Sequence, residues 1–273
     1  MKFKIDHDLH IHSQLSLCSG DPEQNPQAIL EYAKKNNLKK ICITDHFWDE
    51  NVPDTIDWYA VQNFEHISRS KPLPQDENVK FCFGCEAEMD KYGRIGVSKE
   101  RYDEFDFIIV PTTHLHMSGF TIDEEVDGSI EGRAEVWLRH MEALLDSDLP
   151  AGKTGIAHPT CGLIGGNAVD LSRAIRRSVA SLSLITDDEY ERIFKRVAEK
   201  NYGVELNFSW MFNDDWQIPA ILRPYFIAKN CGCKFYLGSD AHTPEDFNTA
   251  MLEFQRSVDY LHLTEDDKYE FVK

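Results

Sequence analysis

Seven short apolar runs recur along this sequence, and six of them end in side chains that are strong metal ligands. The endings are residues 8–12, 44–46, 84–88, 113–116, 157–159, 205–207 and 238–242. Only the sixth ending is expected to supply no ligand. On an extended strand, residues two apart point to the same face, so His10 and His12 can hold one ion together. The repeated order of apolar run and ligand predicts a fold in which many strand ends meet.

The apolar runs are rich in Ile, Val, Phe and Cys, which is typical of buried parallel strands. The clearest runs are residues 40–43, 79–83, 107–110 and 234–237. Helical patterns alternate with them at residues 27–36, 56–68, 133–145, 190–200, 218–230 and 245–256. In a barrel of alternating strands and helices, the C-terminal strand ends form one rim. Ligands that are far apart in the sequence are therefore expected to converge on one pocket.

The candidate donors are more numerous than one ion requires, because a catalytic zinc usually has about three protein ligands and an open position. Two or three ions are therefore expected. A carboxylate shared between ions would bridge them, and Glu86 is the best placed because it directly follows its strand. Glu88 is the reserve candidate for this role.

These residues resemble the PHP domain (polymerase and histidinol phosphatase) family, whose signature near the start is Asp-Leu-His-x-His followed by Ser or Thr. Asp8 to Ser13 match that signature. The later family motifs are similar to residues 44–46, 84–86, His114, His158 and residues 238–242. The resemblance covers nearly the whole chain. It implies an α/β fold, a distorted, TIM-barrel-like seven-stranded (β/α) barrel with a trinuclear metal centre, and phosphoester hydrolysis as the usual activity.

The resemblance also implies a ligand set at the matching positions. The first ion would be held by His10, His12, Glu86 and Asp240, the second by Glu86, His114 and His158, and the third by His46 and His242. The ions are expected to be divalent transition metals. Imidazole suits zinc, iron or cobalt, and carboxylates admit manganese, so the sequence does not identify the metal.

One position departs from the family pattern. Six residues after the second histidine of the first motif, where the family often has another histidine for the third site, this chain has Cys18. Two interpretations stay open. Cys18 ligates the third ion as a thiolate, or it is a bystander and water or Asp21 completes the site.

Composition indicates one ordinary globular domain over residues 1–273, with 42% hydrophobic residues. No stretch approaches the roughly 20 apolar residues of a membrane span, and no signal-peptide core is present, so a cytoplasmic location is expected. Seven cysteines without framework spacing predict free thiols. The formal net charge of −18 argues against a nucleic-acid partner. The sequence does not indicate an oligomeric state.

Two segments, residues 118–132 and 160–183, exceed the usual length of a connection and are expected to shape specificity as long rim loops. In the second, residues 161–167 and the arginines after them could cradle a phosphate through backbone N–H groups and guanidinium forks, and a solvated basic helix is the alternative. The candidate substrate ligands are Arg94, Asn207, Arg173, Arg176 and Arg177. The four arginines are candidates because a guanidinium group can donate two parallel hydrogen bonds to phosphate oxygens.

The predicted reaction is hydrolysis of a small phosphomonoester by metal-activated water. His116, Asp21 or His242 is the hypothesised acid that protonates the leaving alkoxide. The resemblance suggests histidinol phosphate as substrate, and other small phosphomonoesters are nearly as well supported. Two alternatives remain. An amidohydrolase-like C–N hydrolase would need a bridging lysine at the rim, and a non-catalytic metal-binding module would bind metal without turnover.

Overall fold

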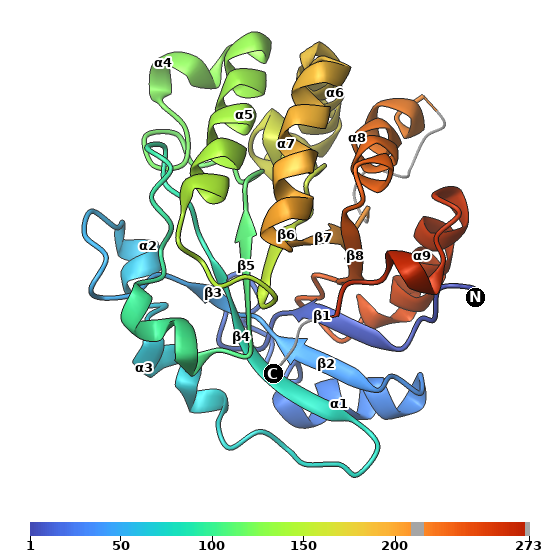
Figure 1. The fold of residues 1–273 in the computed structure, drawn as a ribbon. Helices are drawn as coiled ribbons and strands as arrows, with labels where there is room; N and C mark the ends of the chain where they lie inside the picture. Colours follow the sequence, from blue (N-terminus) through green and yellow to red (C-terminus); the bar gives the residue numbers. More distant parts are fainter. Residues whose placement is uncertain (209–215, 271–273) are drawn as a thin grey trace.

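The computed structural model describes residues 1–208 and 216–270. Its strands are β1 His7–Ile11, β2 Lys40–Ile43, β3 His46–Phe47, β4 Lys80–Ala87, β5 Phe107–Pro111, β6 Thr154–Ala157, β7 Gly203–Leu206 and β8 Lys234–Leu237. The sheet runs in the order β1-β2-β4-β5-β6-β7-β8, and the short β3 pairs with β4. Every strand pairing is parallel. Figure 1 shows the strands at the centre of the molecule and the helices around them.

The first and last strands lie beside each other, so the sheet is nearly closed. Ile11 and Ala241 form a parallel bridge. The backbone N–H of Asp240 donates to the carbonyl of His10 at 2.8 Å, and that of His12 donates to Ala241 at 3.0 Å. We call this contact the β1–β8 seam. The predicted distorted seven-stranded barrel is confirmed.

The inside of the barrel is filled by apolar and aromatic side chains. These buried residues are Leu9, Cys42, Cys82, Phe107, Ile109, Ala157, Tyr236 and Tyr269. Two glycines make room for the tyrosines. A Cβ on Gly155 would lie 2.8 Å from the Tyr236 ring, and one on Gly203 would lie 2.9 Å from the Tyr269 ring. The interior is therefore a packed core, and only its rim is open for chemistry.

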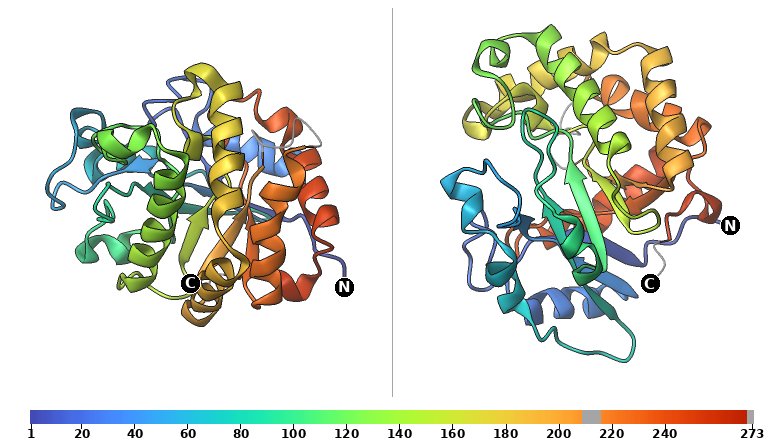
Figure 2. Two further views of the ribbon diagram at one scale, coloured as in Figure 1. Left: turned by 90° about the horizontal axis from the view of Figure 1, so that it is seen from above. Right: turned by 60° about the vertical axis from the view of Figure 1, so that its left-hand side comes forward.

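The helices are α1 Pro26–Lys35, α2 Asp57–Ala60, α3 Phe64–Ile67, α4 Glu124–Asp127, α5 Ile130–Asp146, α6 Leu171–Leu184, α7 Asp187–Lys200, α8 Ile218–Asn230 and α9 Phe247–Tyr260. Figure 2 shows, from two further directions, the helices from α5 onward along the outside of the strands. The predicted single helix over residues 56–68 is wrong. Asn63 caps a new helix there, because its side chain accepts the N–H of His66 and interrupts the first one.

The two long segments contain more regular structure than loops of that length would. Residues 118–132 include α4 and the start of α5. Residues 160–183 include a short 3₁₀ helix, Gly162–Gly165, and most of α6. Gly165 lets the two pack closely, since a Cβ there would lie 1.8 Å from the carbonyl oxygen of Ala174. The second segment therefore contains the helix considered above as the alternative, and a role of either segment in specificity stays a prediction. None of the helices in the described part of the chain combines the length and the apolar character needed to cross a bilayer.

His140 on α5 gives the fold a predictable pH dependence. The side chain is 1% exposed, and burial together with the charge of neighbouring Arg139 lowers its pKa to about 4. The unfolded chain, whose histidine pKa is ordinary, binds more protons than the fold below about pH 6.5, so stability falls as the pH falls. We expect this residue to lower the free energy of unfolding by roughly 2 kcal/mol at pH 5, relative to pH 7.5. Urea unfolding of the metal-free wild type and His140→Met at pH 7.5 and pH 5 checks this. An equal loss in both proteins would contradict it.

Candidate metal centre

The predicted ligands lie together at the C-terminal ends of the strands. His10 is on β1, His46 on β3 and Glu86 on β4, and the other histidines and Asp240 lie within five residues after the ends of β1, β5, β6 and β8. Among residues 1–208 and 216–270, four groups of three residues have ligand atoms that lie, within each group, no more than 4.8 Å apart. They are His10, His12 and Glu86; His10, His158 and Asp240; Glu86, His114 and His158; and His12, His46 and His242. These groups overlap, so the donors form one continuous cluster.

Glu86 lies at the centre of this cluster and is fully buried. Its carboxylate oxygens are 2.8 Å from Nδ1 of His46, 3.1 Å from Nε2 of His158 and 3.4 Å from Nε2 of His12. Burial opposes ionisation, yet positive charge on His46, His10 and His114 holds the pKa of Glu86 well below its usual range. The group is therefore a carboxylate at neutral pH, placed to bridge two cations.

The donor set fits divalent cations, because some of its buried atoms have no hydrogen-bond partner within the described residues. Glu86 Oε2 and His46 Nδ1 are buried, and within the described residues neither makes a hydrogen bond of acceptable geometry, although they are close. Nε2 of His10 is 3.0 Å from Nε2 of His12. Buried polar atoms are normally paired, so imidazoles and a carboxylate that converge with unpaired atoms fit the ligand set of a metal ion.

Carboxylates and hydroxyls orient the histidines from outside the cluster. Nδ1 of His10 lies 2.9 Å from Glu205 Oε1, and Nδ1 of His12 lies 2.8 Å from the hydroxyl of Ser16, which donates to Asp45 at 2.8 Å. With Nδ1 held in this way, Nε2 of each ring points to the centre. Such partners commonly fix the tautomer and the orientation of metal-bound imidazoles.

The other side of the cluster repeats this arrangement. Nδ1 of His114 lies 2.8 Å from Glu88 Oε2, and the Tyr59 hydroxyl also bonds to that carboxylate. Nδ1 of His158 lies 2.8 Å from the hydroxyl of Thr113. Glu88, considered above as a bridging ligand, therefore contacts one histidine from outside instead. Four rings are thus preorganised before any ion binds.

Two of the candidate ligands have strained backbones. His158 has φ of 26° and Asp240 has φ of 55°, both in the region that favours glycine. Such conformations persist where the surrounding structure imposes them, and they are frequent at functional sites. Gly238 is required for a separate reason, because a Cβ there would lie 2.1 Å from Glu205 Oε1 and 2.7 Å from the Cβ of His10.

A cavity of about 840 Å³ opens beside the cluster. Its lining includes six of the candidate ligands, Cys18, His46, His114, His158, Asp240 and His242, together with His116 and Asn207. Aromatic and apolar residues such as Trp58, Leu206 and Phe208 form much of the remaining wall. This volume suits a small organic substrate.

Five predicted catalytic or substrate-binding residues lie outside this lining. The carboxylate of Asp21 accepts the N–H of Glu23 in a turn. The four arginines point elsewhere, so the prediction that they bind substrate phosphate is not supported by their positions. Arg94 bonds to Asp54 at 2.7 Å, Arg177 donates to the carbonyl of Asp127, and Arg173 and Arg176 are exposed on α6. The alternative of a solvated basic helix describes α6 well.

Sequence reasoning missed the role of Glu205, because its strand ending was expected to supply no ligand. Glu205 is fully buried and also accepts the backbone N–H of His158 at 2.7 Å. From β7 it contacts the side chain of His10 on β1, which is not an adjacent strand, and the backbone of His158 at the end of adjacent β6. Spacing in the sequence does not reveal such contacts. One signal was present. A glutamate inside an otherwise apolar strand is seldom buried without a partner.

Arg133, a second residue without a predicted role, ties two rim segments together. It is fully buried on α5, and its Nη1 donates to the carbonyls of Leu115 and Ile164 at 2.6 Å each. We expect Arg133→Met to lower the free energy of unfolding by about 3 kcal/mol, because it leaves buried carbonyls without donors. Denaturant unfolding of the metal-free protein measures this. Arg139→Met, on the same helix, is the control and should cost less than about 1 kcal/mol. Equal losses would refute the expectation.

Comparisons with known proteins identify a family and a similar fold. The model of the PHP domain matches residues 8–209. A search of curated proteins finds no match. Among solved structures, the chain is similar to histidinol phosphate phosphatase from Lactococcus lactis subsp. lactis Il1403, crystallised with zinc, L-histidinol and phosphate. The identity is 18%, the coverage is 92% of this chain and 93% of that one, and the TM-score is 0.55. A structure of an uncharacterized protein matches at 13% identity, with 95% and 70% coverage and a TM-score of 0.41.

Proposed function

Because the chain belongs to the PHP domain family, we propose that it is a metal-dependent phosphoesterase that hydrolyses a small phosphomonoester. The observation that carries this proposal is the fully buried Glu86 carboxylate, surrounded by imidazoles and placed beside an 840 Å³ cavity. Histidinol phosphate is the first substrate to test, since the similar solved structure was crystallised with L-histidinol and phosphate.

The residues would divide the work as follows. His10, His12, Glu86 and Asp240 would hold one ion, and Glu86, His114 and His158 a second. Ions bound there would supply a nucleophilic water near neutral pH and neutralise charge on the phosphoryl oxygens. Glu205, Ser16, Glu88 and Thr113 would keep the histidine rings aimed at their ions. Because the described lining contains no arginine or lysine, the ions would provide most of the positive charge that the phosphate meets.

His116 is the cavity residue that best suits proton donation to the leaving group. It lines the cavity, and its Nδ1 is buried without a hydrogen-bond partner in the described part of the chain. Burial, with the nearby His114, lowers its pKa to about 3, and an adjacent phosphate dianion would raise that pKa again. Of the other two hypothesised acids, Asp21 lies outside the lining, and His242 is a candidate ligand. Slower release of poor leaving groups by His116→Ala, with good leaving groups unaffected, would support the assignment.

The test of the function is phosphate release from a panel of phosphomonoesters that includes histidinol phosphate. Protein loaded with zinc or manganese is compared with a chelated sample and a reloaded one. Release that chelation abolishes and metal restores would support the proposal and rank the substrates. If no ester is cleaved while metal is demonstrably bound, the phosphoesterase proposal fails.

The two alternatives are less well supported by the site. An amidohydrolase-like centre would need a bridging lysine, and the described lining of the cavity contains none. Cleavage of amides without cleavage of phosphate esters would favour that reading. A purely metal-binding module would not need a cavity of this size beside the donors. Tight metal binding without any hydrolysis would favour it.

A further inference from the structure

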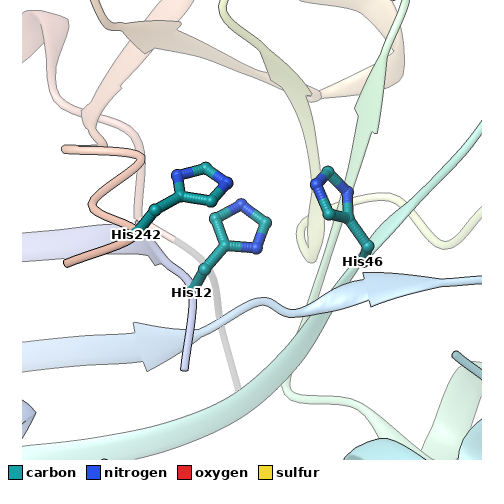
Figure 3. Close-up of side chains that lie close together, drawn as sticks. All are labelled: His12, His46 and His242. Atoms are coloured by element: carbon teal, nitrogen blue, oxygen red, sulfur yellow. The ribbon is translucent and has the colours of Figure 1, made fainter. Parts of the chain in front are cut away.

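Cys18 lies in the loop after β1, at the edge of the cavity, beside two of the candidate metal ligands. Its side chain lines the cavity together with His46 and His242, and the thiol interacts electrostatically with both rings. Figure 3 shows that His46 and His242 face one another across His12 and that each turns a ring nitrogen toward the space between them. The donor nitrogens of these three histidines lie within 4.8 Å of one another. The thiol therefore adds sulfur to a pocket of imidazole nitrogens.

The loop holds Cys18 firmly, because the residues on both sides of it are anchored. The N–H of Leu17 donates to Oε1 of the fully buried Gln62 at 3.0 Å. The hydroxyl of Ser19 donates to the backbone carbonyl of His242 itself. Two residues earlier, the hydroxyl of Ser16 accepts the N–H of His46 at 3.2 Å. The same loop is thus bonded to the backbones of both histidines, and the thiol lies between them.

The donor group of His12, His46 and His242 differs in ligand type from the other three donor groups. The other donor groups include Glu86 or Asp240 as a member, whereas the group of His12, His46 and His242 consists of imidazoles. The nearest carboxylates, Glu86 and Asp240, are members of the other groups, and they approach His46 to 2.8 Å and His242 to 3.6 Å. His46 is 7% exposed and its Nδ1 has no hydrogen bond of acceptable geometry among the described residues. Thiolate and imidazole ligands suit zinc and cobalt, while manganese and magnesium prefer oxygen.

Building on the proposed metal-dependent function, we propose that Cys18, His46 and His242 form a thiolate-containing third site that selects zinc or cobalt over manganese. Metal binding releases the thiol proton to solvent, and the sulfur lone pair forms the bond to the ion. An open position would remain, as in zinc sites with three protein ligands. The chain would then hold ions of different preference side by side, oxygen-rich sites next to a sulfur site.

The experiment loads metal-free protein with cobalt and records the near-ultraviolet absorption and the metal content per chain. The wild type is expected to give a thiolate-to-cobalt charge-transfer band. Cys18→Ser should lose that band and retain fewer cobalt ions. Cys18→His should regain the metal without the band, because it replaces sulfur with nitrogen. The control is Cys161→Ser, since Cys161 also lines the cavity but its Sγ accepts the backbone N–H of Leu163. That variant should match the wild type in band and content.

The outcomes separate this inference from the proposed function. A wild type that binds cobalt without the band, or a Cys18→Ser variant with unchanged band and metal content, overturns the thiolate site while the carboxylate sites stand. A wild type that binds no cobalt overturns the whole metal centre. Manganese should occupy fewer sites than zinc in the wild type, and that difference should shrink in Cys18→Ser. Equal occupancy by both metals in the wild type would contradict the proposed selectivity.

Discussion

Glu86→Gln is expected to lower kcat/KM for phosphomonoester hydrolysis by about 10³-fold or more, because a shared ligand is worth several kcal/mol of charge stabilisation. Glu86 is the one carboxylate within 4 Å of five candidate ligands, His10, His12, His46, His114 and His158, in the described structure. Glutamine keeps the shape and removes the charge. Steady-state kinetics with metal-loaded protein, and metal content after dialysis, measure the effect.

Glu88→Gln is the matched control for this prediction. It makes the same chemical change two residues away, at a carboxylate that contacts His114 from outside the cluster. Losing such a partner typically costs 10–100-fold, roughly a tenth or less of the effect expected at Glu86. Circular dichroism should show both variants folded. If the two variants lose equal activity, or if Glu86→Gln keeps its full metal content, Glu86 is not the bridging ligand.

Glu205→Gln is expected to weaken metal binding by roughly 10–100-fold. Glutamate accepts hydrogen bonds from Nδ1 of His10 and from the backbone N–H of His158 at the same time. Glutamine can present its N–H₂ to His10, which favours the wrong tautomer and directs the ring lone pair away from the centre. Competition with a chromophoric chelator at fixed pH measures the affinity.

The substitution at Glu205 should leave the barrel folded, because the side chains have the same shape. Glu199→Gln, on the exposed face of α7, is the control and should not change affinity. Affinity in Glu205→Gln that equals that of the control would mean that His10 is oriented by other contacts. A large loss of structure would instead show that Glu205 serves the fold more than the ions.

Much of the fold could be predicted from the sequence, because most strands have two signals, an apolar run and the metal-ligand residues that follow it. β2 and β8 coincide with the predicted runs at residues 40–43 and 234–237, and α8 coincides with residues 218–230. A buried apolar run predicts the strand, and the ligand after it predicts the rim. The helix predicted over residues 56–68 failed because a single local bond, from Asn63 to the N–H of His66, outweighs a periodic pattern.

The parts of the site that could not be predicted depend on where side chains point and on contacts between residues that are far apart in the sequence. Arginines near a motif are reasonable candidates for binding phosphate. In the structure, however, Arg94 donates to the carboxylate of Asp54, and Arg177 donates to the backbone carbonyl of Asp127. Spacing fixes which residues share a strand end, and it says nothing of which partner a long flexible side chain chooses. The same limit hid Glu205, whose partners His10 and His158 lie on other strand ends.

The β1–β8 seam connects metal binding to the cooperativity of folding. His10 on one side of this seam and Asp240 on the other belong to one donor group, and His12 and His242 belong to another. These two groups can therefore exist only while the first and last strands are in register, and separation of the seam would release an ion bound there. Bound metal then stabilises closure of the whole barrel by mass action, about 2.7 kcal/mol at 100 times Kd. A chelator would remove this contribution, so a protein that holds metal across the seam would unfold more readily after chelation.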